Sequence, residues 1–191
     1  MDKRILKTKL LILETFIDLV DKNPDRKITV TELTEKANIA RKTFYLHYSY
    51  VDDIIISYLN DFSSFFYSAA RNNIEKSDDK ETILILLMED FLNNVKEHRK
   101  FLTAIVKSQV YYEHLNLFAF KILKDSSFVF LNKFYKFNAE KFDLIIKYHS
   151  AGIAKIITEY IDSDFTDYNK KSVETLASII LPSLERVLEP I

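Results

Sequence analysis

Residues that break helices are scarce in this chain. Its 191 residues include one Gly and three Pro, the two residue types that most strongly interrupt regular structure. Leu, Ile, Lys and Glu are frequent, and these residues either favour helices or tolerate them well. Because 48% of the residues are hydrophobic, the chain can also bury a sizeable core. We therefore predict an all-α fold.

Several classes of function are disfavoured by what the sequence lacks. The chain has no Cys, which excludes disulfides, thiolate chemistry and Cys-ligated zinc. We find no signal-peptide pattern and no apolar run near the ~20 residues that a membrane span needs. The single Gly leaves no Gly-rich phosphate loop, and the four His do not have the spacing of a metal motif. We therefore expect a cytoplasmic protein that is not an enzyme and needs neither metal nor cofactor.

The spacing of apolar residues predicts about nine helices. Polar breaks and capping residues separate them. The predicted ranges are about 3–21, 29–37, 40–46, 50–72, 79–96, 98–107, 111–136, 139–162 and 169–188. In the first of them we expect the buried stripe to be Leu6, Leu10, Leu13, Ile17 and Val20.

The second helix has two independent start signals. Thr29 and Glu32 have the spacing of a capping box, and Ile28 and Leu33 occupy the two positions of a hydrophobic staple. The helix is short, and Asn38 follows it where a tight turn would need a positive φ, which Asn tolerates better than most residues. Two short helices joined by a tight turn, with a third helix before them, indicate a helix-turn-helix unit.

The segment ARKTFYLHY, residues 40–48, mixes cations with aromatic rings. A helix that enters the major groove needs both, because one side packs on its own domain and the other meets phosphates and base edges. We assign Phe44 and Tyr48 to the packing side. The distribution of charge also favours DNA binding by this part of the chain. Residues 1–48 hold 10 Lys+Arg and 7 Asp+Glu, a net charge of +3, whereas the remaining residues have a net charge of −4.

The stretch ITVTELTEKANIARKTFYLHYSYVDDII resembles the DNA-binding region of TetR (tetracycline-repressor-like) regulators. The resemblance covers about residues 5–60. It implies a homodimer that binds double-stranded operator DNA and carries a variable C-terminal body, often with an effector site. By position in the motif it implies DNA contacts from Thr31, Arg41, Lys42, Thr43, Tyr45 and His47.

Three positions depart from the family pattern. Asn38 replaces the usual turn Gly, Ala40 replaces the usual Ser at the start of the recognition helix, and Val51 replaces a Lys that grips phosphate at the start of the fourth helix. Ala is a poor N-cap, at a cost of about 1 kcal/mol. Affinity should then depend more on Arg41 and Lys42 and on the basic N-terminal residues Lys3, Arg4, Lys7 and Lys9.

The body is rich in aromatic residues, with eleven between Phe101 and Phe142. They can be ordinary core, or they can line a cavity for an apolar effector. For the second reading we predict a pocket that includes Phe62, Phe66, Tyr111, Phe118 and Phe128.

The only Gly, Gly152, lies in a small-residue patch within a predicted helix. Gly costs about 1 kcal/mol there relative to Ala, so close packing should compensate. We predict a dimer interface formed by Ser150, Ala151, Gly152 and Ala154. The alternative is close packing inside one subunit. This stretch also resembles the body of dihydroxyacetone-kinase-type regulators within the same family.

Together these features predict two domains. Residues 1–50 would form a three-helix helix-turn-helix domain, and residues 51–191 a helical bundle for ligand binding and dimerisation. The predicted function is sequence-specific transcription regulation by a homodimeric repressor that an effector releases. A transcriptional activator and a ligand-free helical interaction protein remain as alternatives.

Overall fold

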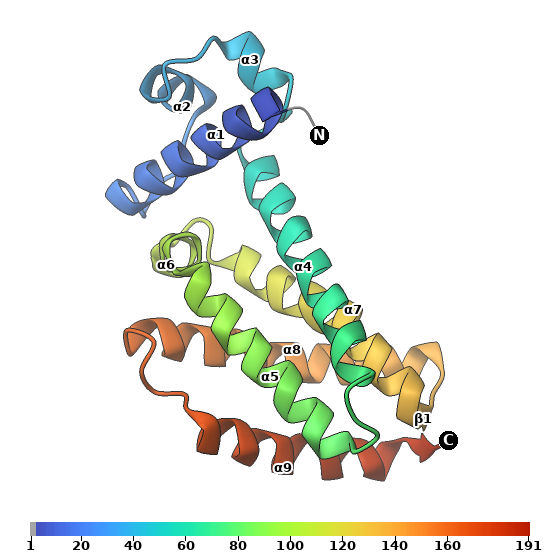
Figure 1. The fold of residues 1–191 in the computed structure, drawn as a ribbon. Helices are drawn as coiled ribbons and strands as arrows, with labels where there is room; N and C mark the ends of the chain where they lie inside the picture. The colour runs from blue at the N-terminus through green and yellow to red at the C-terminus, as the bar shows by residue number, and fades with distance from the viewer. Residues whose placement is uncertain (1–2) are drawn as a thin grey trace. The chain divides into compact units, whose positions relative to one another are not determined.

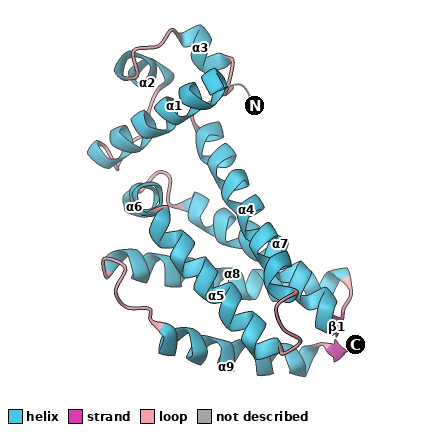
Figure 2. Cartoon of the chain, viewed as in Figure 1, coloured by secondary structure: helices cyan, strands magenta, loops and turns pink. Residues whose placement is uncertain are grey.

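The computed structural model describes residues 3–191 and is helical almost throughout (Figures 1 and 2). The all-α fold is thus confirmed. The helices of this part of the chain are α1 (Lys3–Lys22), α2 (Val30–Lys36), α3 (Arg41–Tyr45), α4 (Asp52–Ile74), α5 (Lys80–Glu97), α6 (Arg99–Lys107), α7 (Glu113–Phe134), α8 (Ala139–Asp162) and α9 (Lys170–Val187). Each falls within a few residues of a predicted range. Two short strands, β1 (Tyr135–Lys136) and β2 (Glu189–Pro190), pair antiparallel and were not predicted.

The chain divides into two compact units. Residues 3–61 and 100–115 form the first, and residues 62–99 and 116–191 form the second. The first unit therefore holds α1–α3, the first half of α4, all but the first residue of α6 and the start of α7. These bounds differ from the sequence-based division at residue 50, which stays a prediction about function. The difference arises because residues 100–115, distant in sequence, group with the N-terminal part; Ser108 and Tyr111 in this segment form hydrogen bonds with Pro24 and Ile28.

In the first unit, α1 buries Ile12, Phe16, Leu19 and Val20. The predicted stripe was wrong in its first half, because Leu6 and Leu10 are 54% and 52% exposed. The buried residues recur at intervals of four, three and one, so they also share one helix face. Two overlapping stripes therefore fit the helical period, and the spacing of apolar residues alone could not distinguish them.

In the second unit, α5 packs along α9 (Figure 1). A buried cluster joins α5, α7 and the C-terminal end of the chain. Its buried members are Ile83, Phe130, Leu131, Tyr135, Leu184 and Leu188. The pairing of β1 with β2 closes this end, with Tyr135 opposite Pro190 and Lys136 opposite Glu189.

Local caps explain several helix starts in this unit. The Asp79 carboxylate accepts a hydrogen bond from the Thr82 amide at 2.8 Å, and the Asn138 side chain accepts one from the Lys141 amide at 2.8 Å. Asn169 and Ser172 form a reciprocal capping box at the start of α9. Each satisfies backbone N–H groups that a helix leaves unpaired at its first turn. Over residues 3–191, none of the helices has both the length and the apolar character that crossing a bilayer requires.

Candidate nucleic-acid interface

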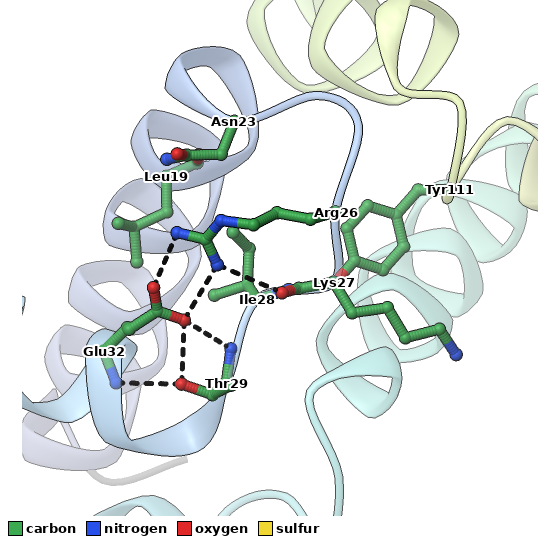
Figure 3. Close-up of polar contacts among 8 residues, drawn as sticks. All are labelled: Leu19, Asn23, Arg26, Lys27, Ile28, Thr29, Glu32 and Tyr111. Carbon is green, nitrogen blue, oxygen red and sulfur yellow. Dashed lines mark hydrogen bonds and ion pairs between the residues drawn. The ribbon is translucent and has the colours of Figure 1, made fainter.

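The start of α2 is fixed by the predicted capping box. The Thr29 hydroxyl accepts from the Glu32 amide at 3.2 Å, and the Glu32 carboxylate accepts from the Thr29 amide at 3.0 Å (Figure 3). Ile28 and Leu33, the predicted staple, are 4% and 0% exposed. The capping box is confirmed, and both staple residues are buried, so the entry of the chain into α2 is well defined.

A charged pair that the sequence analysis missed reinforces this corner. The Arg26 guanidinium donates to both carboxylate oxygens of Glu32, at 2.6 and 3.2 Å (Figure 3). The hydrogen bonds from Arg26, and then those from Thr29, lower the pKa of Glu32 to about 2. Glu32 therefore stays ionised, and Arg26 is engaged with it rather than offered to a phosphate. This pair could not be predicted from helical spacing, because Arg26 lies in the loop before α2 and is six positions from Glu32.

The turn between α2 and α3 has the predicted geometry. Asn38 has φ 51°, in the left-handed region, where a short polar side chain is tolerated. Ala40 is the N-cap of α3 and makes no side-chain cap hydrogen bond. Its carbonyl still accepts from the Thr43 and Phe44 amides, at 2.8 and 3.3 Å. The start of α3 therefore has backbone hydrogen bonds to its N-cap residue but no side-chain cap, as expected for Ala at this position.

The residues of α3 and the turn after it divide into two faces. Phe44 and Tyr48 are 0% and 7% exposed, so both pack inside the unit, as predicted. Tyr45 is 58% exposed. Arg41 and Lys42 are exposed, whereas Thr43 and His47 are partly buried. The interleaved sequence therefore gives a helix anchored by aromatic rings that presents cations and a phenol to solvent.

Two of the predicted contact residues lie together. The Arg41 guanidinium donates to the Thr31 hydroxyl at 2.7 Å, which joins α2 to α3 across the turn. Arg41 and Thr31 can therefore act at one place on DNA. The Lys9 ammonium, in turn, lies 5.7 Å from the centre of the Tyr48 ring. Positive charge from α1 thus reaches the segment that follows α3.

The start of α4 lacks the phosphate-binding Lys of the family pattern, as the sequence indicates. Val51, at the position where the family often has Lys, is 8% exposed and belongs to the core. Asp53 accepts from the amides of Ser49 and Tyr50, at 2.8 and 2.9 Å. These two hydrogen bonds hold the turn that leads into α4. The Asp53 carboxylate can reach both free amides from the first turn of the helix.

Tyr111 lies in the first unit, away from the pocket in which we predicted it. Its hydroxyl accepts a hydrogen bond from the Ile28 amide at 3.0 Å; both residues are drawn in Figure 3. Its ring packs at a steep angle against the ring of Phe16, with 5.4 Å between the ring centres. The side chain is 1% exposed, and burial raises its pKa. Next to it, the Ser108 hydroxyl donates to the Pro24 carbonyl at 2.8 Å. The turn between α6 and α7 therefore holds the loop that leads into α2.

The second unit contains a cavity of about 580 Å³ among α5, α7, α8 and α9, with Phe66 of α4 also in its wall. Of the five predicted pocket residues, only Phe66 lines it. The rings of Phe62 and Phe118 pack against each other in the core in a T-shaped arrangement, with 4.8 Å between the ring centres. Phe128 is 49% exposed and packs on Phe142. The aromatic residues therefore serve mostly as core, and aliphatic side chains supply most of the cavity wall.

The small-residue patch on α8 is split between two faces. Ser150 and Ala154 are 9% and 4% exposed, whereas Ala151 and Gly152 are exposed. A Cβ atom built on Gly152 would meet nothing within 4 Å. Close packing inside the subunit therefore does not explain this Gly. Of the four residues predicted for the interface, only Ala151 and Gly152 lie on the surface of the single chain.

These features define a class: a helix-turn-helix protein with a helical body. No family model matches the chain. A segment of 56 residues is 34% identical to an uncharacterized HTH-type transcriptional regulator of Bacillus subtilis (strain 168), YxbF. The segment covers 29% of this chain and 15% of the length of that protein.

Solved structures resemble the chain over almost its whole length. The dihydroxyacetone kinase operon activator DhaS matches over 93% of both chains, with 23% identity and a TM-score of 0.52. A TetR transcriptional regulator from Streptococcus agalactiae 2603V matches over 97% of both, with 21% identity and a TM-score of 0.59. The TetR family repressor AlkX from Dietzia sp. matches over 94% of this chain and 98% of its own, with 17% identity and a TM-score of 0.56. The chain therefore has the fold of the TetR family regulators, and DhaS represents the second resemblance seen in the sequence.

Proposed function

We propose that this chain is a sequence-specific DNA-binding transcription regulator. The observation that carries the proposal is the surface of α3, where Arg41, Lys42 and Tyr45 are exposed on a helix anchored from behind by Phe44. Arg and Lys can neutralise phosphates and read guanine edges in the major groove, and Tyr and His side chains can donate to phosphates. Because such a protein must reach chromosomal DNA, we place it in the cytoplasm.

The active form is a homodimer. A recognition helix places only about three or four side chains on base edges, and α3 has five residues, so one copy can read only a short half-site. Two copies related by a two-fold axis would read two half-sites about 34–36 Å apart. The surface of α8 and α9 is our candidate interface. It carries exposed apolar side chains at Leu144, Tyr148 and Ile179, and Gly152 on α8 is exposed as well.

The body cavity is the candidate effector site. A ligand there would release DNA only if it binds the DNA-incompetent shape more tightly than the competent one. Among proteins with this fold, AlkX is described as implicated in biodegradation of n-alkanes, and a Bacillus halodurans protein as a fatty acid degradation regulator. Those descriptions agree with an apolar effector for a cavity with an apolar wall.

Repression is the mode we propose. Occupying a promoter is enough to block it, whereas activation needs a further contact with the polymerase. Proteins of this fold use both modes, since AlkX is a repressor and DhaS an operon activator. The fold alone therefore does not decide between repression and activation. A reporter gene fused to the regulated promoter would decide it, because deletion of the gene for this protein should raise expression of the reporter if the protein is a repressor.

The test of the proposed function is binding to the DNA upstream of its own gene. In a mobility shift at about 150 mM salt, close to physiological ionic strength, the full chain should bind this fragment at least about 10³-fold more tightly than a shuffled fragment of equal length, as specific regulators do. Equal affinity for both fragments would remove sequence specificity. No binding to either, by a protein that is still folded and dimeric, would favour the helical interaction protein instead.

A further inference from the structure

Helix α1 carries a second apolar stripe besides the one that it buries. Leu6 and Leu10 are 54% and 52% exposed, and Leu13 and Ile17 are partly exposed. These four residues, which we name the outer stripe, recur at intervals of four, three and four, so they lie along one face of the helix. Because α1 meets the interior of its own unit mainly with other residues, the outer stripe is left incompletely covered.

The spacing of the outer stripe is that of a helix that packs on another helix. Alternating intervals of four and three are those of the a and d positions of a heptad, which form the seam of a coiled coil. From Leu6 to Ile17 the outer stripe is about 17 Å long, at ~1.5 Å per residue. A contact of about three helical turns falls at or below the ~1,200 Å² at which standard interfaces begin. It would therefore be weak and reversible.

The charges beside the outer stripe are divided by sign along the helix. Lys7, Glu14 and Asp21 recur every seven residues and so lie on one side of α1. Lys3, one turn before Lys7, extends this row. All four side chains are exposed, and within residues 3–191 none of them forms an ion pair. The first half of the outer stripe is thus flanked by cations and the second half by anions.

A two-fold axis would bring these opposite signs together. In an antiparallel pair of identical helices, the first half of one lies beside the second half of the other. If Leu10 packs on the partner's Leu13, all four residues of the outer stripe are covered in both copies. The same register places Lys7 near the partner's Glu14, twice about the axis. A parallel pair would instead bring like charges to the same level.

Other occupants fit this pattern of charge less well. An anionic bilayer would attract Lys3 and Lys7, but it would repel Glu14 and Asp21 at the other end of the outer stripe. A partner helix that carries charges of one sign meets the same conflict. The division of charge therefore favours a partner with the same division, which a second copy of α1 has.

We propose that the outer stripe is an interface between two copies of this chain, in which α1 packs antiparallel on α1 of the second copy. Its residues are distinct from those of the candidate interface on α8 and α9, so a chain that uses both contacts assembles beyond a dimer. So weak a contact matters most where two dimers are held close together, as on neighbouring sites of one DNA molecule. That consequence rests on the proposed function, whereas the contact itself does not need DNA.

The test is sedimentation equilibrium of the full chain without DNA, at subunit concentrations up to about 1 mM, where weak contacts become populated. The mass should rise above that of a dimer. At ~50 mM salt, Lys7→Glu and Glu14→Lys should each weaken this step about 10-fold, because each sets like charges together at two places. The double variant Lys7→Glu/Glu14→Lys restores opposite signs and should associate within about 3-fold of the unchanged chain.

A matched pair of variants tests the apolar part of the contact. Leu10 and Leu11 are neighbours on α1 and are 52% and 40% exposed, but Leu11 points about 100° away from Leu10 around the helix. Leu10→Ser should weaken the step beyond the dimer at least about 10-fold, because it removes apolar area from two symmetric layers. Leu11→Ser should leave the step within about 2-fold.

Four outcomes overturn the inference. A chain that never exceeds the mass of a dimer at about 1 mM has no such contact. A double charge variant as weak as the single variants removes the antiparallel pairing, and equal effects of Leu10→Ser and Leu11→Ser remove the outer stripe as its centre. Binding to phosphatidylserine vesicles that Leu10→Ser abolishes would assign the outer stripe to a membrane. Specific DNA binding in the mobility shift can accompany each of these results, so they are distinguishable from failure of the proposed function.

Discussion

The hydroxyl of Tyr111 offers a substitution that changes one hydrogen bond and little else. Tyr111→Phe removes the oxygen that accepts from the Ile28 amide at 3.0 Å. The ring, and with it the contact to Phe16, should stay in place. Ile28 is 4% exposed and Tyr111 is 1% exposed, so water cannot replace the lost acceptor without opening the structure. The N–H group would remain buried and unpaired.

The expected cost follows from that arrangement. Leaving a buried donor unsatisfied costs about 1–3 kcal/mol, and the volume change of one oxygen adds little. The free energy of unfolding of the first unit should therefore fall by about 1–3 kcal/mol. Exchange of the Ile28 amide with solvent should also accelerate, by about tenfold for each 1.4 kcal/mol lost. Because Ile28 precedes the α2 cap, DNA affinity should fall as well.

The assay is denaturant unfolding followed by circular dichroism, combined with hydrogen exchange of the Ile28 amide. Tyr112→Phe is the matched control, since the neighbouring side chain is 40% exposed and surface substitutions usually stay within about 0.5 kcal/mol. If Tyr111→Phe is as stable as Tyr112→Phe and the Ile28 amide exchanges at an unchanged rate, the hydrogen bond does not hold the loop and the reasoning is refuted.

Three further predictions concern the DNA-binding surface of α3, the dimer interface and the loss of folding stability at low pH. Tyr45→Phe combined with His47→Ala should weaken operator binding in a mobility shift without lowering the melting temperature by more than a few degrees, and an unchanged affinity would contradict the assigned contacts. Gly152→Leu should shift sedimentation toward monomer while the monomer keeps its stability, because a Cβ atom has open space there; a dimer that survives and melts earlier would place Gly152 inside the subunit. The pKa of Glu32 is lowered to about 2 from an ordinary value of 4.5, so its stabilising contribution is full above pH 4.5 and is lost as the pH falls toward 2. Glu32→Gln should therefore reduce the loss of unfolding free energy between pH 4.5 and pH 2. If the variant loses as much stability over this range as the unchanged protein, Glu32 is not the cause of the loss.

Local signals explain why much of the first unit could be predicted from the sequence. The capping box of Thr29 and Glu32 and the turn at Asn38 depend on residues a few positions apart. The same holds for the burial of Phe44 and Tyr48, because helical spacing separates the two faces of a short helix. Where both a start signal and a stop signal were present, the elements were predicted within a residue or two.

Features that depend on distant contacts were missed or misplaced. The hydrogen bond from Ile28 to Tyr111 joins residues 83 positions apart, and no periodicity encodes it. The pairing of Tyr135 with Pro190 involves strands of two residues, too short for an alternating pattern. The wall of the cavity depends on how far four helices stand apart, which aromatic content does not determine. We predicted Tyr111 in a pocket because it belongs to an aromatic-rich segment. In the structure its hydroxyl instead binds the Ile28 amide in the loop before α2.

Salt dependence of DNA binding tests the central claim most directly, because it counts phosphates neutralised by particular cations. The logarithm of the binding constant should fall linearly with the logarithm of the salt concentration, with a slope of about −0.9 for each phosphate contacted. Lys42→Gln removes one exposed cation of α3 from each subunit, so the slope of a dimer should become shallower by about 2. Lys124→Gln, an exposed cation of α7 in the second unit, is the matched control and should leave the slope unchanged. A DNA affinity that does not depend on salt, or equal slopes for the Lys42 and Lys124 variants, would contradict the account of α3 as the DNA-binding helix.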